Sequence, residues 1–195
     1  MAKRKIVAVA CSTGGPSTLQ EIIPKLPAKI GAPVVLVQHM PKGFTKILAD
    51  RLNDISKIAV SEAKDKELIL NDHVYIAQAG YHMNVSFDGK AHRIRYSDEP
   101  FREGVKPCAN YMFESLIDSK FDEIVCVVLT GMGADGAEGI ENLVKSSAKK
   151  VRILLQDKES AVVYGMPGSV IKRGLDCNIC ELANISNEIV RLLEG

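Results

Sequence analysis

Short runs of consecutive apolar residues, each closed by a glycine, a proline or a polar turn, constrain the fold of this 195-residue chain most strongly. Such runs are typical of parallel strands that are buried on both faces of a sheet. Segments with helical periodicity separate them, and this alternation predicts a three-layer α/β fold with a mostly parallel central sheet. The apolar runs are residues 5–11, 32–38, 123–129 and 151–156, and the helical segments are residues 17–26, 44–52, 109–117, 136–144, 167–173 and 185–193.

The segment 57–96 differs from the rest because its pattern predicts short strands without helices between them. Its last two strands flank Asp88-Gly89, a pair that is typical of a tight β-hairpin turn. We therefore expect an antiparallel, β-rich insertion within a single domain that covers residues 1–195, a length sufficient for one hydrophobic core.

Composition excludes several classes of function. The formal net charge is +1, so no strong field favours nucleic acid or a membrane surface as a partner. No apolar run approaches the roughly 20 residues that span a bilayer, and the first apolar run is too short for a signal peptide, so a cytoplasmic protein is expected. The five cysteines are odd in number, and the pair Cys177 and Cys180 has no second pair beside it. We expect reduced thiols, no metal site and no cofactor.

Chemically useful side chains follow the apolar runs. Ser12 comes after the first run, His39 after the second, Asp135 after the third and Asp157 after the fourth. Because the carboxyl ends of parallel strands meet at one edge of a sheet, a serine, a histidine and an aspartate can lie together there as a catalytic triad. Asp157 ranks second as the carboxylate because charged neighbours indicate a solvated loop.

Simpler interpretations stay open on the pattern alone. Ser12 and Asp135 both precede helical segments, and serine and aspartate are preferred N-caps. A phosphate loop is weaker because the stretch around Ser12 lacks the G-x-x-x-x-G-K-[ST] and G-x-G-x-x-G spacings. The G-x-S-x-G nucleophile elbow is also incomplete, since Ala10 stands in the place of the first glycine. The remaining histidines are expected on the surface or in the hairpin: His73, His82 and His92.

Four short sequence segments, in this order along the chain, indicate a resemblance to a known protein family that hydrophobic periodicity alone does not reveal. The segments ACSTGGPSTLQ, VQHMPKGFT, LTGMGADGAEG and QDKESAVVYGMP extend from near the start of the chain to Gly168. Together they resemble the catalytic domain of the chemotaxis protein-glutamate methylesterases, the CheB family. The resemblance implies a doubly wound sheet and a triad of Ser12, His39 and Asp135.

The same resemblance implies an activity. Members of this family hydrolyse glutamate methyl esters on the cytoplasmic helices of chemoreceptors, release methanol, and often deamidate receptor glutamines. The tetrahedral intermediate needs hydrogen-bond donors aimed at its oxyanion, and the backbone N–H groups of Thr13 and Gly14 are the expected donors. The loop that carries Met132 and Gly133 is implied to line the substrate site.

Two departures from the family pattern stand out. The segment KPCANYMF carries Cys108 and Asn110 where the family usually has serine and aspartate. The family usually also has a receiver domain that covers the site, whereas here the first strand is expected by Ile6. We therefore expect an uncovered site, with a receiver domain supplied elsewhere or removed, and a monomer.

Other functions remain as alternatives. The chain is either a receptor methylesterase, a small-ester serine esterase on the same fold, or a non-catalytic module whose loops bind an anion. Arg95, Arg102 and Lys106 are candidates for contact with acidic receptor helices, and ordinary solvated charges are an equal alternative.

Overall fold

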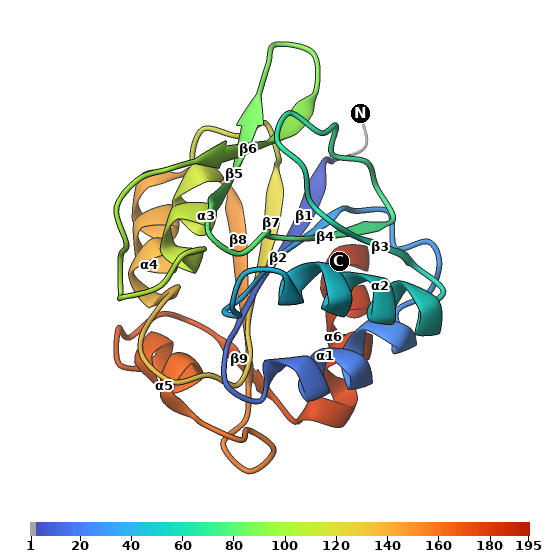
Figure 1. Ribbon diagram of the computed structural model, residues 1–195. Coiled ribbons are helices and arrows are strands. Elements are labelled where there is room, and N and C mark those ends of the chain that lie inside the picture. Colours follow the sequence, from blue (N-terminus) through green and yellow to red (C-terminus); the bar gives the residue numbers. More distant parts are fainter. Residues whose placement is uncertain (1–2) are drawn as a thin grey trace.

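The computed structural model describes residues 3–195 and contains a seven-stranded sheet in the order β3-β4-β2-β1-β7-β8-β9 (Figure 1). Every neighbouring pair in this sheet is parallel, and a separate antiparallel hairpin packs beside it. The sheet strands are β1 (Lys5–Cys11), β2 (Val34–Gln38), β3 (Ala59–Glu62), β4 (His73–Ile76), β7 (Glu123–Val128), β8 (Lys150–Gln156) and β9 (Asn178–Cys180), and the hairpin is β5 (His82–Phe87) with β6 (His92–Ser97).

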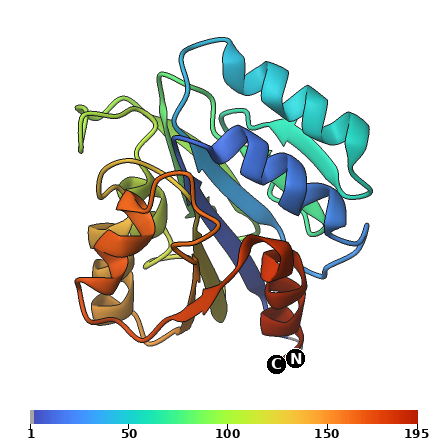
Figure 2. The same cartoon turned by 90° about the horizontal axis from the view of Figure 1, so that it is seen from below.

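Helices cover both faces of the sheet, which gives the expected three layers. The helices are α1 (Gly15–Ile22), α2 (Phe44–Ile55), α3 (Ala109–Ser115), α4 (Ala137–Ser146), α5 (Gly165–Ile171) and α6 (Ile185–Glu194), with short 3-10 turns η1 (Ile23–Lys25) and η2 (Leu182–Asn184). Figure 2 shows α1, α2 and α6 on one face and α3, α4 and α5 on the other. Each side forms its own buried apolar cluster.

Strand β1 lies in the middle of the sheet and explains the continuous apolar runs. Ile6 and Ala8 contribute to one apolar cluster, while Val7 and Val9 contribute to the other. The chain leaves β1 toward β2 on one side and reaches β7 on the other side later, so the sheet is doubly wound. Ligands of such sheets bind beyond the carboxyl ends of the strands, at the point where the winding reverses.

The β-rich segment 57–96 differs in part from the expectation. Only β5 and β6 are antiparallel, joined through the predicted Asp88-Gly89 turn, whereas β3 and β4 pair in parallel and extend the central sheet. A four-residue strand carries too little pattern to fix its direction, which the longer connections decide instead. The short edge strand β9 was not predicted for the same reason.

Two of the histidines expected at the surface are buried. His82 and His92 do lie on the hairpin strands, but His82 is fully buried and His92 is 8% exposed. His92 stacks on Phe121 with ring centroids 3.8 Å apart, and His82 contacts backbone carbonyls of Glu99 and Pro100. Both rings are therefore structural members of the hairpin side of the core.

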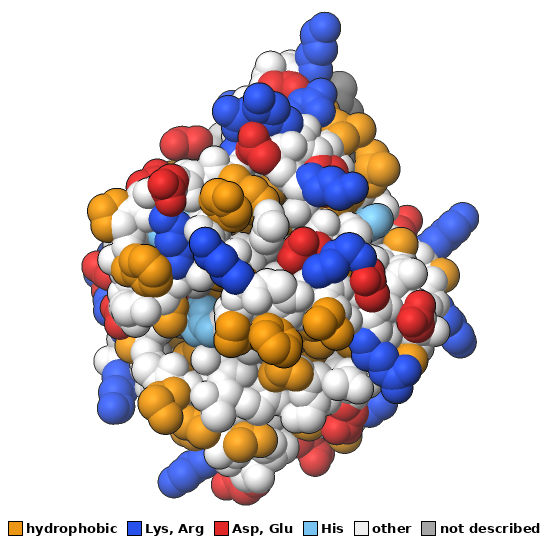
Figure 3. All heavy atoms as spheres, in the orientation of Figure 1, with side chains coloured by type: hydrophobic (Ala, Val, Ile, Leu, Met, Phe, Trp, Pro, Cys, Tyr) orange, Lys and Arg blue, Asp and Glu red, His pale blue; other side chains and the backbone are white. Residues whose placement is uncertain are grey.

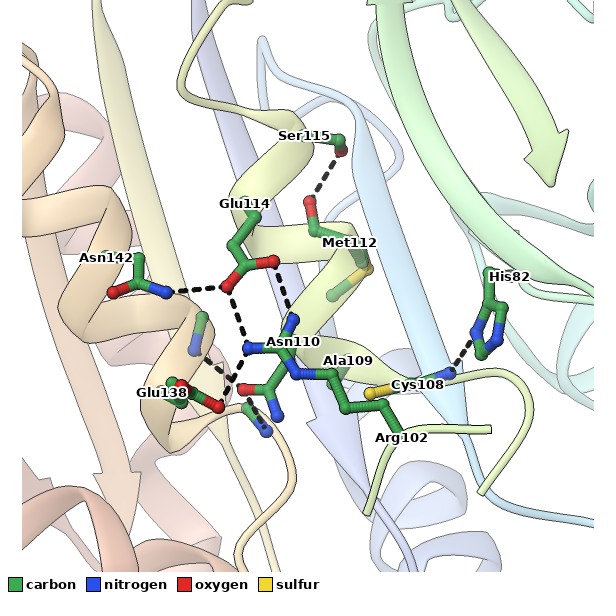
Figure 4. Close-up of polar contacts among 12 residues, drawn as sticks. His82, Arg102, Cys108, Ala109, Asn110, Met112, Glu114, Ser115, Glu138 and Asn142 are labelled. Carbon is green, nitrogen blue, oxygen red and sulfur yellow. Dashed lines mark hydrogen bonds and ion pairs between the residues drawn. The ribbon is translucent and has the colours of Figure 1, made fainter. Parts of the chain in front are cut away.

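The N-termini of α3 and α4 are capped by side chains from each other's segment. The Asp135 carboxylate, just before α4, accepts hydrogen bonds from the backbone N–H groups of Ala109 and Asn110 in the first turn of α3. In return, the Asn110 side-chain oxygen accepts from the N–H groups of Gly136 and Gly139 at the start of α4, at 3.0 and 2.7 Å (Figure 4). Each helix start thus depends on the other for its otherwise unpaired donors.

No helix among residues 3–195 has the length and hydropathy that a membrane span requires.

The close approach of the two helices generates a stability prediction at Gly139. A Cβ at this position would lie 2.6 Å from the Cα and carbonyl oxygen of Asn110. Gly139→Ala is therefore expected to lower the free energy of unfolding by about 1–3 kcal/mol, since the helices must separate. Gly168→Ala on α5 is the matched control, because its Cβ would meet nothing nearer than 3.4 Å. Denaturant unfolding of both variants checks the prediction, and equal stabilities would contradict it.

Candidate active site

Ser12 and His39 lie side by side at the carboxyl ends of two central strands. They follow directly on Cys11 and Gln38, the last registered pair between β1 and β2. The His39 N–H donates to the Cys11 carbonyl at 3.2 Å, and the Ser12 N–H donates to the Thr130 carbonyl beyond β7 at 3.0 Å. The Ser12 hydroxyl is partly exposed and makes no hydrogen bond to any group of residues 3–195.

His39 and Asp135 form a direct pair. His39 Nε2 lies 2.7 Å from Asp135 Oδ2, and their side chains are 11% and 3% exposed. Burial by itself raises the pKa of the Asp135 carboxyl, but hydrogen bonds from His39, Cys108 and Ala109 hold that pKa below its ordinary value. The carboxylate is therefore ionised at neutral pH and orients the imidazole. The structure thus brings His39 and Asp135 together, with Ser12 on the adjoining strand end.

Neither Ser12 nor Asp135 caps the helix that follows it in the sequence. Gly14 is the N-cap of α1 and Gly136 is the N-cap of α4, and neither helix has a side-chain cap of its own. The Ser12 hydroxyl therefore does not cap α1, and the N-cap alternative for Ser12 is wrong. Asp135 does cap a helix, but that helix is α3. The rival Asp157 accepts hydrogen bonds from Ser160.

A buried glutamine that the sequence analysis did not single out holds the two strand ends together. Gln38 is 1% exposed, and its Nε2 donates to the backbone carbonyls of Ser12 and His39 at 3.0 and 2.9 Å. Its Oε1 accepts from the Cys11 thiol at 3.0 Å. Gly15 must be glycine, because an added Cβ would lie 1.8 Å from this oxygen. The sequence did contain a sign of this role, because Gln38 is a polar residue at the end of the otherwise apolar strand β2.

The turns expected to bind an oxyanion surround Ser12. The backbone N–H groups of Thr13 and Gly14 have no hydrogen-bond acceptor within residues 3–195. Thr130 Oγ1 donates to the Thr13 carbonyl at 2.9 Å and so fixes this turn. Met132 is 68% exposed, and Gly133 has a left-handed backbone with φ 89°. The loop after β7 therefore lies open to solvent beside the serine.

Exposed apolar side chains occur on the face that carries this site. Figure 3 shows hydrophobic side chains gathered near the start of α2. Phe44 and Ile47 on α2 are 51% and 63% exposed, and Val162, which packs against Gly14, is 66% exposed.

The three basic residues that the sequence analysis gave as candidates for contact with acidic helices differ in their surroundings. Arg102 pairs with Glu114 and Glu138, Lys106 pairs with Asp98, and Arg95 is exposed.

Comparison with known proteins identifies the family. The family model described as CheB methylesterase matches residues 7–189. The chain belongs to the CheB methylesterase family. It is 35% identical to the chain in the crystal structure of the Thermotoga maritima CheB methylesterase catalytic domain, with a TM-score of 0.91, and the match covers 98% of this chain and 100% of that one. The family membership predicted from the strand-end motifs is thus confirmed.

Similar curated proteins carry the name protein-glutamate methylesterase/protein-glutamine glutaminase. The protein from Bacillus subtilis (strain 168) is 44% identical over 186 residues, which cover 95% of this chain and 52% of the relative. The protein from Geobacillus kaustophilus (strain HTA426) is 41% identical over 191 residues, which cover 98% of this chain and 54% of the relative. The chain spans about half the length of the curated relatives it matches.

The two hydrogen bonds that Gln38 donates to the carbonyls of Ser12 and His39 generate a second stability prediction. Gln38→Met keeps the length of the side chain but leaves the carbonyls of Ser12 and His39 without their donor. We expect the free energy of unfolding to fall by about 1–3 kcal/mol, because two partly buried carbonyls lose their donor. Gln20→Met, on the exposed side of α1, is the control and should change stability by less than about 0.5 kcal/mol. Thermal unfolding followed by circular dichroism measures both variants. A Gln38→Met variant as stable as the control would refute the stabilising role of the Gln38 hydrogen bonds.

Proposed function

We propose that this chain is a serine hydrolase that removes methyl groups from glutamate methyl esters of chemoreceptors. The observation that carries the proposal is the 2.7 Å pair between His39 and the buried Asp135, beside a serine at the adjoining strand end, in a CheB methylesterase chain. Serine is a weak nucleophile until a general base takes its proton, and an oriented histidine is the usual base.

The pairing of His39 gives each ring nitrogen a role. An ionised Asp135 only accepts, so Nε2 carries the proton that it receives, and Nδ1 is the unprotonated nitrogen of the neutral ring. Nδ1 is then the base that takes the Ser12 proton as the hydroxyl oxygen attacks the ester carbonyl. The proton next passes to the departing methanol, and water activated in the same way hydrolyses the acyl-enzyme.

The oxyanion of each tetrahedral intermediate requires donors that point at it. The N–H groups of Thr13 and Gly14 are suited to this because no acceptor within residues 3–195 occupies them. They also lie at the N-terminal end of α1, where the helix dipole favours negative charge. Met132 and Gly133 line the opposite side of the substrate site in this proposal.

The same chemistry extends to amides. Attack on a glutamine side chain passes through an equivalent tetrahedral oxyanion and releases ammonia in place of methanol. The relatives are named for both activities, and this supports deamidation of receptor glutamines as a second reaction at the one site. The proposed substrates are segments of cytoplasmic receptor helices, so the proposed location is the cytoplasm, and a receiver domain is the proposed regulator.

The nucleophile assignment predicts the effect of Ser12→Ala. Methanol release from methylated receptor should fall by at least about a thousandfold, because neither His39 nor the oxyanion donors replace the attacking oxygen. Ser146→Ala, on the exposed end of α4, is the control and should retain full activity. A fluorophosphonate probe should label the wild type and not Ser12→Ala. Turnover near the wild-type rate in Ser12→Ala would exclude the proposed nucleophile.

The choice of carboxylate predicts a difference between two asparagine variants. Asp135→Asn should reduce kcat by roughly a hundredfold to ten-thousandfold, because the amide no longer selects the Nε2-protonated ring. Asp157→Asn should change kcat little, since that carboxylate contacts Ser160. Steady-state methanol release by both variants decides between them, and a larger loss in Asp157→Asn would reverse the assignment. Strong activity on p-nitrophenyl esters with none on methylated receptor would instead favour a small-ester esterase.

A further inference from the structure

The Cys108 thiol lies directly against the Asp135 carboxylate. Cys108 Sγ is 2.9 Å from Asp135 Oδ1, and Cys108 is fully buried. An ionised carboxylate only accepts, so the thiol donates this hydrogen bond. Figure 4 shows Cys108 at the start of α3, between His82 and the turn that contributes Ala109.

This thiol remains protonated. Burial raises the pKa of Cys108 far above its ordinary value, and the neighbouring Asp135 charge raises it further. Cys108 is therefore a neutral donor and not a thiolate nucleophile.

The thiol is not needed to keep Asp135 in place. Asp135 accepts four hydrogen bonds, from His39, Cys108 and the backbone N–H groups of Ala109 and Asn110. The two backbone donors, at 2.6 and 2.9 Å, fix the carboxylate to the rigid start of α3. What the thiol adds is a dipole whose positive end points at the carboxylate.

We propose that Cys108 sets the basicity of His39 by acting through Asp135. A donor to the carboxylate draws part of its negative charge away from the imidazole, so the imidazolium form of His39 is less stabilised. Cys108 is fully buried and acts on His39 only through Asp135, so it is a positioning residue. Its effect on His39 is independent of any substrate, while its effect on turnover rests on the proposed function.

The identity of the donor determines the size of the effect. A serine hydroxyl is a stronger donor than a thiol, and the family pattern usually has serine at this place. With cysteine, Asp135 keeps more of its charge for His39 than it would with serine. This chain should therefore have a more basic His39 than its own Cys108→Ser variant.

Several charged and titratable groups lie on the segments around Cys108, and each interacts with a partner other than the Cys108 thiol. These groups are His82, Arg102, Lys106, Tyr111, Glu114 and Glu138. Arg102 is paired with Glu114 and Glu138 and lies over the Tyr111 ring, and Lys106 is paired with Asp98.

His82 is the titratable ring nearest to Cys108. His82 Nδ1 accepts the Cys108 N–H at 3.1 Å, and its Nε2 donates to the carbonyls of Glu99 and Pro100, which describes a neutral ring. Burial lowers the pKa of His82, which favours its neutral ring. A shift in His39 is then attributable to the donor at position 108.

The first test measures His39 directly in the wild type and in Cys108→Ala, Cys108→Ser and Cys126→Ala. NMR titration of the histidine ring signals, assigned with His39→Gln, reports the pKa of His39. Cys108→Ala should raise this pKa by roughly 0.5–1 unit, and Cys108→Ser should lower it by a few tenths of a unit. Cys126→Ala removes a buried thiol from β7 with no contact to Asp135 and should leave it unchanged.

The second test measures kcat/KM for methanol release across pH. In Cys108→Ala the acidic limb should move to higher pH, so activity falls by roughly three- to tenfold there and matches the wild type on the plateau. An equal loss at every pH with an unshifted His39 would mean that the thiol only fills space, and would overturn the proposal. If Cys108→Ala does not fold, Cys108→Ser, which keeps a donor on the same Cβ, decides by the direction of its shift.

The two proposals fail separately. Shifts of His39 in the expected directions, without methanol release by the wild type, would leave the role of Cys108 intact and refute the proposed function. Methanol release that depends on Ser12, with His39 unmoved in both Cys108 variants, would refute the role of Cys108 alone.

Discussion

The exchange of caps between α3 and α4 is the contact on which the site depends. Asp135 accepts hydrogen bonds directly from the first N–H groups of α3, and Asn110 accepts them directly from those of α4. Because each carboxylate oxygen of Asp135 is anchored by a backbone donor, the other lone pair of Oδ2 points in a fixed direction, and His39 meets it there. The position of the His39 imidazole therefore depends on how α3 and α4 pack together. Gly139 permits this packing, because a Cβ there would lie too close to the backbone of Asn110.

Buried amide side chains extend this order to the strand ends. Gln38 ties the turns after β1 and β2 to one another, and Gln156 does the same after β7 and β8, where its Oε1 accepts the Thr130 N–H and its Nε2 donates to the Ser160 carbonyl. Parallel strands end with unpaired backbone groups at this edge, and each glutamine satisfies several of them. The turns beside Ser12 are held from two sides as a result.

Much of the architecture and part of the site follow from the sequence. Continuous apolar runs predicted β1, β2, β7 and β8, and their ends predicted that Ser12 and His39 meet, because a parallel register brings strand ends together. The direction of β3 and β4 was wrong, since strands of four residues carry little pattern. Asp135 ranks above Asp157 because charged neighbours of Asp157 indicate a solvated loop, and the family resemblance then implies Asp135 as the triad carboxylate. The contacts of Asn110 and Cys108 depend on the approach of α3 to α4, which no local pattern encodes.

The double duty of Asp135 has a consequence for how such sequences evolve. In the proposed mechanism, a descendant that lost its serine would lose the attacking atom but nothing of its architecture, since the Ser12 hydroxyl has no hydrogen-bond partner among residues 3–195. The aspartate is different, because its loss would also strip two donors at the start of α3. Selection for folding alone would therefore preserve the aspartate in a degenerate copy. If the proposed mechanism holds, the serine is the residue whose retention indicates retained chemistry, whereas the aspartate could be retained for folding alone.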